Sequence, residues 1–202
     1  MLYLSGSRPS NLDHQSAMKE GNVGLMSSPN ISYDTKGWIW AADNGCFSDK
    51  WDSGRWETWL NRTAGALFAT VPDVVGDAAA TRERWDEYHS TVAATGHLPA
   101  YVLQDGQDGV DVPWDEAACI FVGGTTDYKL GESARRHVTE ARSRGLWVHM
   151  GRVNSYKRLS MAAAWGCNSA DGTLLAFGPD ILVPKLLEWV RRIQTEPRQL
   201  TL

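Results

Sequence analysis

Cysteine is scarce in this chain of 202 residues, and the three present, Cys46, Cys119 and Cys167, show no C-x-x-C spacing. An odd number of widely separated thiols predicts neither a disulfide framework nor a structural zinc site. The sequence also lacks an H-E-x-x-H motif, a Walker lysine loop and a G-x-S-x-G nucleophile elbow. We therefore expect reduced thiols, no bound metal and no cofactor.

Long hydrophobic runs are absent as well, since no apolar stretch approaches the ~20 residues that a membrane-spanning helix needs. Residues 1–7 show neither the basic start nor the apolar core of a signal peptide. We therefore expect a cytoplasmic protein without a membrane partner. The 43% of hydrophobic residues, with no Gly-X-Y or heptad repeat, excludes disorder, collagen and coiled coil.

Positive charge is in deficit overall, because the formal net charge is -4. Its distribution is uneven, since residues 129–158 include eight basic and two acidic side chains and so carry +6. Such a segment can form a phosphate-binding face on an otherwise acidic protein. Within it, residues 135–144 alone are better interpreted as a solvated helix with its own ion pairs. The charge pattern is compatible with a nucleic-acid partner.

Short apolar runs alternate with helical stretches along the chain. The apolar runs predict strands at 2–5, 23–27, 38–42, 67–71, 100–104, 119–122, 146–150 and, more weakly, 166–169. The stretches between them predict helices at 10–20, 55–65, 77–95, 132–144, 155–165 and 180–195. Strands that are apolar throughout suit a parallel sheet covered by helices.

Eight strands with intervening helices predict an α/β fold, namely a compact, trimmed TIM-like (β/α)8 barrel near the lower size limit of that fold. The connections after the second and sixth strands look too short for full helices, which is why we expect trimming. A doubly wound open sheet is the competing architecture, because periodicity alone does not show closure. No Pro-rich linker or internal repeat divides residues 1–202, so we predict a single domain.

Polar residues occur at most of the predicted strand ends, where a (β/α)8 barrel carries its catalytic side chains. In chain order they include Ser7, Asp43, Asn44, Asp73, Asp77, Gln104, Gly123, Gly124, His149, Arg152, Asn154 and Asp171. Each alone is weak evidence, because Asp, Asn and Gly also form ordinary turns. Several carboxylates, amides and glycine turns at one rim together predict an active site.

Several of these strand ends resemble motifs of the tRNA-guanine transglycosylases. Residues 39–48, I-W-A-A-D-N-G-C-F-S, are similar to the D-S-G-G-F-Q segment of that family, and residues 166–171, G-C-N-S-A-D, resemble its G-x-D-x-x-D segment. V-L-Q-D-G at 102–106, F-V-G-G at 121–124 and H-M-G at 149–151 are similar to its V-Q-G-G strand end, its phosphate loop and its L-M-G-V-G turn. The resemblance covers residues 39–172.

This chain departs from the tRNA enzymes in two respects, because they are longer and carry a C-x-C-x-x-C zinc site. In size and in lacking zinc it resembles the short DNA-acting members of the superfamily. These are antiviral DNA glycosylases that excise modified phage bases, and DNA enzymes that insert 7-deazaguanines. The resemblance implies a DNA glycosylase that cleaves the N-glycosidic bond of a modified base extruded from DNA.

The resemblance also implies a role for individual residues. Asp171 is expected to be the nucleophile or electrostatic stabiliser beneath the sugar, and Asp43 the acid/base near the leaving base. The residues expected to bind the substrate are Asn44, Phe47, Asp73, Asp77, Gln104, Gly123 and Gly124. The residues expected at the DNA phosphates are Lys129, His149, Arg152, Asn154, Lys157 and Arg158.

Three alternatives remain open at this point. A base-exchange enzyme, in which a free 7-deazaguanine replaces water as the acceptor, would use the same two aspartates. A non-catalytic nucleic-acid-binding subunit would not need both aspartates, and a hydrolase of free nucleosides or sugars would not need the basic segment. No lysine ends a predicted strand, which disfavours a Schiff-base lyase step.

Overall fold

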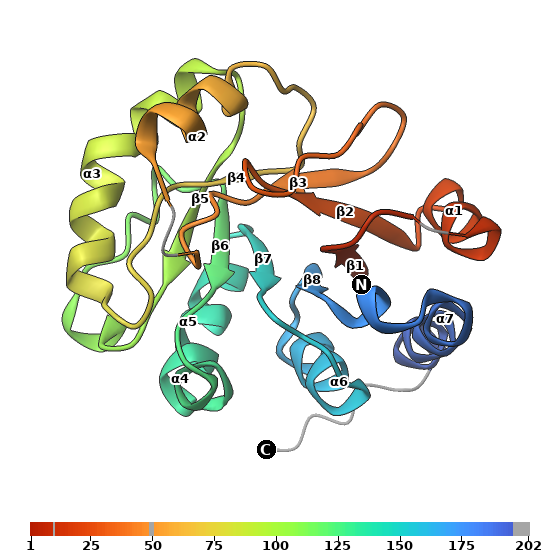
Figure 1. The fold of residues 1–202 in the computed structure, drawn as a ribbon. Coiled ribbons are helices and arrows are strands. Elements are labelled where there is room, and N and C mark those ends of the chain that lie inside the picture. The colour runs from red at the N-terminus through yellow and green to blue at the C-terminus, as the bar shows by residue number, and fades with distance from the viewer. Residues whose placement is uncertain (10, 49–50, 196–202) are drawn as a thin grey trace.

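The computed structural model describes residues 1–9, 11–48 and 51–195, and its eight strands form one closed, all-parallel barrel (Figure 1). The strands are β1 Leu2–Ser5, β2 Val23–Ser27, β3 Trp40–Ala42, β4 Ala69–Thr70, β5 Pro99–Leu103, β6 Cys119–Val122, β7 Trp147–Met150 and β8 Ser169–Gly172. Pairing of Leu4 with Asp171 in parallel register closes β8 against β1. The predicted (β/α)8 barrel is confirmed, and the open sheet is excluded.

Helices surround this ring of strands (Figure 1). They are α1 Leu12–Lys19, α2 Ser53–Leu60, α3 Ala78–Ala94, α4 Thr126–Leu130, α5 Glu132–Ser143, α6 Tyr156–Trp165 and α7 Pro179–Thr195, with 3-10 turns η1 Gln107–Gly109 and η2 Leu174–Phe177. In the part of the chain that the structure describes, no helix is both long and apolar enough to cross a lipid bilayer.

Side-chain caps fix where most of these helices begin. Asn11, Asp52, Asp77, Thr125 and Ser155 each accept a hydrogen bond from the backbone N–H three residues further on. These bonds satisfy donors that have no partner within the helix. The predicted helix start at residue 10 lies outside the described residues.

The hydrophobic side chains form two clusters, as expected for a barrel with a helical coat. Leu4, Met26 and Ala41 belong to a cluster inside the barrel. Their neighbours Tyr3 and Leu25 belong to the larger cluster between the strands and the helices. This alternation follows from the two-residue period of a strand, which turns successive side chains to opposite faces.

The prediction that the connections after the second and sixth strands lack full helices is only partly confirmed. The connection after β2, residues 28–39, contains no helix, in agreement with the prediction. The connection after β6 contains both α4 and α5, so the expectation that it is too short was wrong. The other helix-poor connection follows β5 instead, where Gly106, Gly109 and Pro113 interrupt the chain and leave only η1.

The last strand lies three residues later than predicted. Gly166 adopts φ 91° and caps the C-terminus of α6, so the chain is still leaving the helix where the strand was expected. Strand β8 therefore runs over Ser169–Gly172. As a result, Asp171 lies within the barrel wall rather than in a loop after it.

Close approach of three strands at Gly24 gives a first testable prediction. A Cβ there would lie 2.6 Å from the backbone oxygen of Ile39 and 2.7 Å from Cδ2 of Leu4. We expect Gly24→Ala to lower the free energy of unfolding, measured by urea denaturation, by about 1–3 kcal/mol through overpacking.

The control is Gly54→Ala in α2, where the nearest atom to an added Cβ, Asp52 Oδ1, is 3.7 Å away. Because alanine favours the helix over glycine, this variant should be neutral or slightly more stable. Equal destabilisation by both substitutions would contradict the packing argument.

Candidate active site

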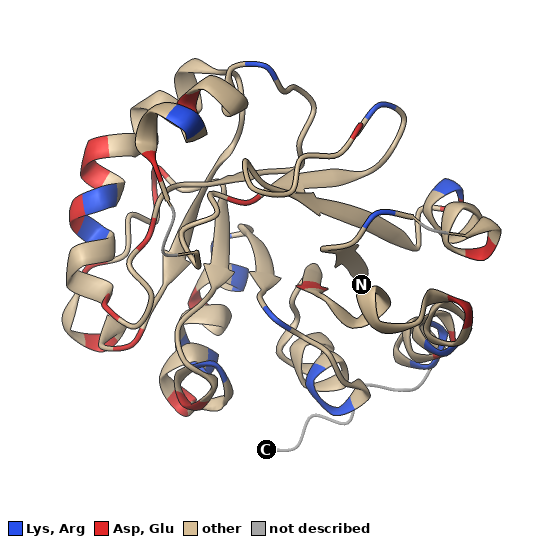
Figure 2. Cartoon of the chain, viewed as in Figure 1, with Lys and Arg blue, Asp and Glu red and all other residues tan. Residues whose placement is uncertain are grey.

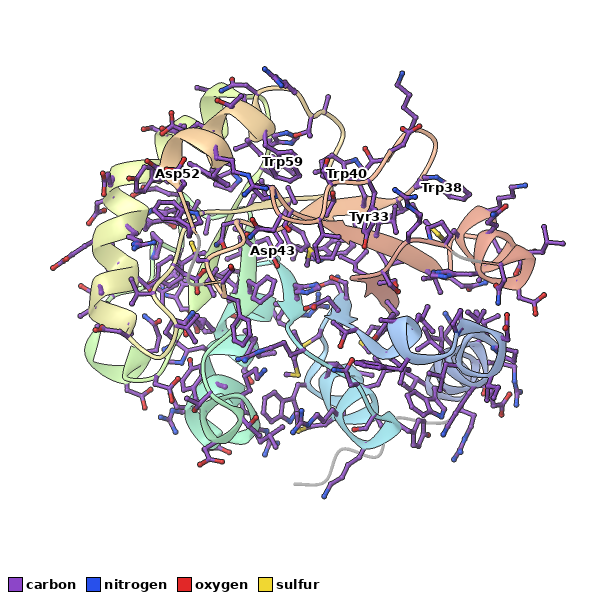
Figure 3. The ribbon with its side chains drawn as sticks, in the orientation of Figure 1. Tyr33, Trp38, Trp40, Asp43, Asp52 and Trp59 are labelled. Atoms are coloured by element: carbon purple, nitrogen blue, oxygen red, sulfur yellow. The ribbon has the colours of Figure 1, made fainter. Side chains whose placement is uncertain are left out.

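A cavity of about 610 Å³ opens at the C-terminal end of the barrel, and every strand or the residues just after it contribute to its lining. This is the face on which TIM-barrel enzymes carry their active sites, and the volume suits a small organic group. Figure 3 shows Asp43 near the centre of the ring of strands. Strand β8, three strands away from β3 around the ring, contributes a second carboxylate, Asp171.

Asp171 is held in place by hydrogen bonds to one of its oxygens. Oδ1 accepts a bond from the backbone N–H of Arg152 (3.2 Å) and lies 3.0 Å from Nε2 of His149. Nδ1 of His149 is 2.8 Å from Oγ of Ser169, which itself accepts a bond from the indole of Trp147 (2.9 Å). A carboxylate oxygen can only accept, so Nε2 of His149 donates to Asp171, while Nδ1 and the Ser169 hydroxyl hold the ring in this orientation.

The second carboxylate oxygen of Asp171, Oδ2, accepts no hydrogen bond from any described residue. One oxygen of Asp171 is thus fixed while the other remains available to a ligand. Such an arrangement fixes the orientation of a carboxylate and leaves one of its oxygens free to contact a reacting atom.

Arg152 connects opposite sides of the cavity mouth. It is the single non-glycine residue with positive φ (59°) among the described residues, a left-handed conformation that directs its N–H to Asp171. Its guanidinium donates to the backbone oxygen of Gly124 and lies 4.8 Å from the ring centre of Phe47. Because β3 and β7 face each other across the barrel, the contact between Arg152 and Phe47 spans the opening.

The carboxyl group of Asp43 is electrostatically unlike an exposed aspartate. Burial, with a smaller contribution from the nearby charges of Asp171 and Asp73, raises its pKa to about 7, although the hydrogen bond from the Gly45 N–H acts in the opposite direction. That bond is 2.7 Å long. A carboxyl group with such a pKa still holds its proton in part at neutral pH, as a general acid must.

A network of amide hydrogen bonds surrounds Asp73, whose pKa is also raised by burial. Asn44 Nδ2 donates to Oδ1 of Asp73 (2.8 Å), and Gln104 Nε2 donates to Oδ2 (2.5 Å). Asn44 uses its other amide proton on Val71 O and accepts a bond from the Cys46 N–H, so it has little capacity left for a ligand. Asp73 retains an unused lone pair and Gln104 an unused N–H. These two residues are therefore better candidates than Asn44 for contacting a base.

Ten of the fifteen predicted site residues line this cavity. They are Asp43, Asn44, Phe47, Asp73, Gln104, Gly123, Gly124, Arg152, Asn154 and Asp171. The two glycines fit the close packing there, since a Cβ on Gly123 would lie 2.6 Å from Cγ1 of Val102 and Gly124 has φ +72°. Both positions therefore require the absence of a side chain.

Three of the remaining predictions need correction. Asp77 is exposed and caps α3 instead of facing the cavity. His149 has no exposed surface and uses both ring nitrogens within the protein, so it does not reach a phosphate. Lys129 is 4% exposed, and its Nζ donates to the backbone oxygen of Gly151 (3.2 Å). Burial lowers the pKa of this lysine to about 8.

The other two predicted phosphate residues, Lys157 and Arg158, lie in the first turn of α6, close to the rim but outside the cavity lining. Lys157 is exposed and Arg158 is half-buried. Both remain accessible to a ligand larger than the cavity.

The sequence did not single out Ser169, although it orients His149 toward Asp171. The period of a strand could have found it, since residues 169 and 171 of one strand face the same side. Gly151 was also missed as a lining residue; a Cβ there would lie 2.7 Å from Cε1 of Phe121. No group of three or more His, Cys, Asp or Glu side chains that could hold a metal ion occurs among the described residues.

No protein-family model and no curated protein sequence matches this chain. Solved structures do match it. A cube-shaped, porous protein cage designed by fusing symmetric oligomeric domains aligns with a TM-score of 0.55 at 12% identity, over 96% of this chain and 72% of the other. Tryptophan synthase from M. tuberculosis aligns with a TM-score of 0.52 at 12% identity, over 95% and 89%.

The chain is a TIM barrel. At 12% identity these likenesses show the fold alone and carry no information about the substrate. The chemistry of this TIM barrel must therefore be argued from the residues of its cavity.

The raised pKa of Asp43 predicts that the free energy of unfolding decreases as the pH rises. Because the folded protein holds this proton more tightly than the unfolded chain, stability is lost as pH rises from about 4 toward 7. In Asp43→Asn the side chain is neutral at every pH and this loss disappears. Between pH 5 and 8 the stability of the variant relative to wild type should rise, by at most about 3 kcal/mol.

Urea denaturation at the two pH values measures this difference. Asp13→Asn on the exposed side of α1 is the matched control and should show no such change. A constant difference between Asp43→Asn and wild type at both pH values would mean that the Asp43 carboxyl titrates normally.

Proposed function

We propose that this TIM barrel is a DNA glycosylase, which cleaves the N-glycosidic bond of a modified nucleobase and leaves an abasic site. One observation carries the proposal: Asp43, with a pKa of about 7, and Asp171, with one oxygen fixed and the other open, face the same cavity. Glycosidic cleavage requires this division of labour between a proton donor and a carboxylate. The resemblance to the short DNA-acting members of the transglycosylase superfamily supports the same reading.

In the proposed reaction, Asp171 Oδ2 approaches C1′ from beneath the sugar and stabilises the positive charge that develops as the bond to the base breaks. Asp43 delivers its proton to the departing base, so the electron pair of the broken bond leaves on a neutral group. A water molecule then adds at C1′ and returns a proton to Asp43. The sum is hydrolysis, and no cofactor is consumed.

Recognition of the base is assigned to the groups with unused hydrogen-bonding capacity. Asp73 can accept a bond and Gln104 can donate one, while Asn44 holds Asp73 in position. The exposed ring of Phe47 offers a surface on which an extruded base can stack. The base must leave the duplex, because the bond to be broken is not accessible within stacked DNA.

The strand itself would be held at the rim of the cavity, where Arg152, Asn154, Lys157 and Arg158 provide cationic and polar groups. A base modification confined to viral DNA would let such an enzyme attack an invader and spare the host. We therefore propose an antiviral role in the cytoplasm.

The deciding experiment incubates the purified protein with phage DNA that carries modified bases and with matched unmodified DNA. Mass spectrometry of released bases and a count of abasic sites measure the reaction. We expect release of a modified base by wild type and by Asp13→Asn, and none above background by Asp171→Asn. Release that occurs only when a 7-deazaguanine is supplied would instead identify base exchange, and binding without release would identify a non-catalytic subunit.

The pH dependence of release gives a separate prediction. Since Asp43 must be protonated to act, the rate should fall tenfold for each pH unit well above 7. Asp43→Asn should be slower by about 10²–10⁴-fold at pH 6 and lose this descending limb. A wild-type rate that stays constant up to pH 9 would contradict the role of Asp43 as the acid.

A further inference from the structure

The connection without a helix after β2 leaves a groove on the side of the barrel, between residues 29–36 and α2. Its volume is about 820 Å³, and three cationic side chains, Lys36, Arg55 and Arg62, line it together with one carboxylate, Asp34. In Figure 2, blue segments lie on α2, on the loop after it and on the β2–β3 connection. We refer to this feature as the α2 groove.

The cations of the α2 groove differ from those of the basic segment noted in the sequence. On α5 and at its C-terminal cap, Arg135 pairs with Glu132, Arg136 with Asp108 and Arg144 with Glu140, so their charges are largely neutralised. Within the described ranges, Lys36, Arg55 and Arg62 form no ion pair. Unpaired cations around a groove favour an anionic ligand.

The walls of the α2 groove are held by specific hydrogen bonds. The indole of Trp59 donates to Oγ of Ser32 (3.1 Å), and the guanidinium of Arg55 donates to the backbone oxygen of Pro29 (2.9 Å). Figure 3 shows the labelled Trp59 on α2 and Tyr33 on the connection. Both bonds tie the connection to α2, so the groove exists before any ligand binds.

The α2 groove lies next to the catalytic cavity, because residues of one chain segment, 28–32, line either the one or the other. Ser28, Asn30 and Ile31 face the cavity, whereas Pro29 and Ser32 face the groove. The hydroxyl of Tyr33, also in the groove, donates to the backbone oxygen of Gly6 (3.0 Å), which lines the cavity. A polymer with one residue in the cavity can therefore reach the groove by passing over this segment.

We propose that the α2 groove binds the sugar–phosphate backbone of the DNA strand beside the extruded nucleotide. Lys36, Arg55 and Arg62 bind phosphates, and the aromatic faces of Tyr33 and Trp59 lie against sugar or base. The inference rests on the proposed function, since it supplies the strand contact that a DNA glycosylase needs. It adds a second strand contact to the one proposed at Arg152, Asn154, Lys157 and Arg158 on the rim of the cavity.

The test measures binding of fluorescent, unmodified DNA by anisotropy at several salt concentrations, with single-stranded and duplex oligonucleotides of one sequence. The groove variant carries Lys36→Gln, Arg55→Gln and Arg62→Gln. The matched control carries Arg135→Gln, Arg136→Gln and Arg144→Gln, on α5 and at its C-terminal cap, and so removes the same charge. Thermal unfolding confirms that both variants fold.

We expect the groove variant to bind DNA at least tenfold more weakly than wild type at low salt. The slope of log K against log salt concentration should decrease by about 2–3, since each lost phosphate contact accounts for about 0.7–0.9. The α5 control should change affinity less than twofold. Because unmodified DNA undergoes no reaction, this result does not depend on base release.

Three outcomes would overturn the inference. Equal loss in the groove variant and the α5 control would mean that only net charge matters. Unchanged DNA affinity in the groove variant would place the strand elsewhere, and the glycosylase proposal would still stand if wild type releases bases. Competition by polyglutamate, without a change in salt slope between wild type and the groove variant, would assign the groove to an acidic protein segment.

Discussion

Closure of the sheet by hydrogen bonds between β8 and β1 is the constraint on which the site depends. Parallel pairing of Leu4 with Asp171 brings residues 167 positions apart into the same layer. Only in a closed ring do all eight carboxyl ends point to one opening, so that Asp43 from β3 and Asp171 from β8 can share a cavity. An open sheet with the same strands would have left these two carboxylates at separate places along an edge.

Within that ring, the carboxyl groups of Asp43 and Asp171 have different surroundings. Burial favours the neutral form of Asp43, whereas one oxygen of Asp171 is held by hydrogen bonds from the Arg152 N–H and from His149. His149 is oriented by the Ser169 hydroxyl, which in turn accepts a bond from the indole of Trp147. The difference between the two aspartates is therefore set by their surroundings in the barrel.

Much of the fold could be predicted from the sequence, since apolar runs and the caps between them are local signals. The errors arose where a boundary depends on distant pairing: β8 is placed by its register with β1, which no local pattern encodes. For the candidate site, strand-end position sufficed to predict that Asp43, Asp73, Gln104 and Asp171 line one cavity. It misjudged His149 and Lys129, because whether a polar side chain turns inward is decided by neighbours on other strands.

The side of the barrel between β3 and β4 is built differently from the rest. Strand β4 has two residues, and its ladder with β3 contains the single pair Ala42 and Ala69. Asn44 compensates, because its backbone N–H donates to Thr70 Oγ1 (2.7 Å) and its amide donates to Val71 O (2.8 Å). One residue thus supplies two further hydrogen bonds between the ends of β3 and β4, where the ladder is shortest. The hydrogen bonding across this part of the wall and the position of the Asp73 carboxylate therefore depend on the same amide group, so a substitution of Asn44 alters both at once.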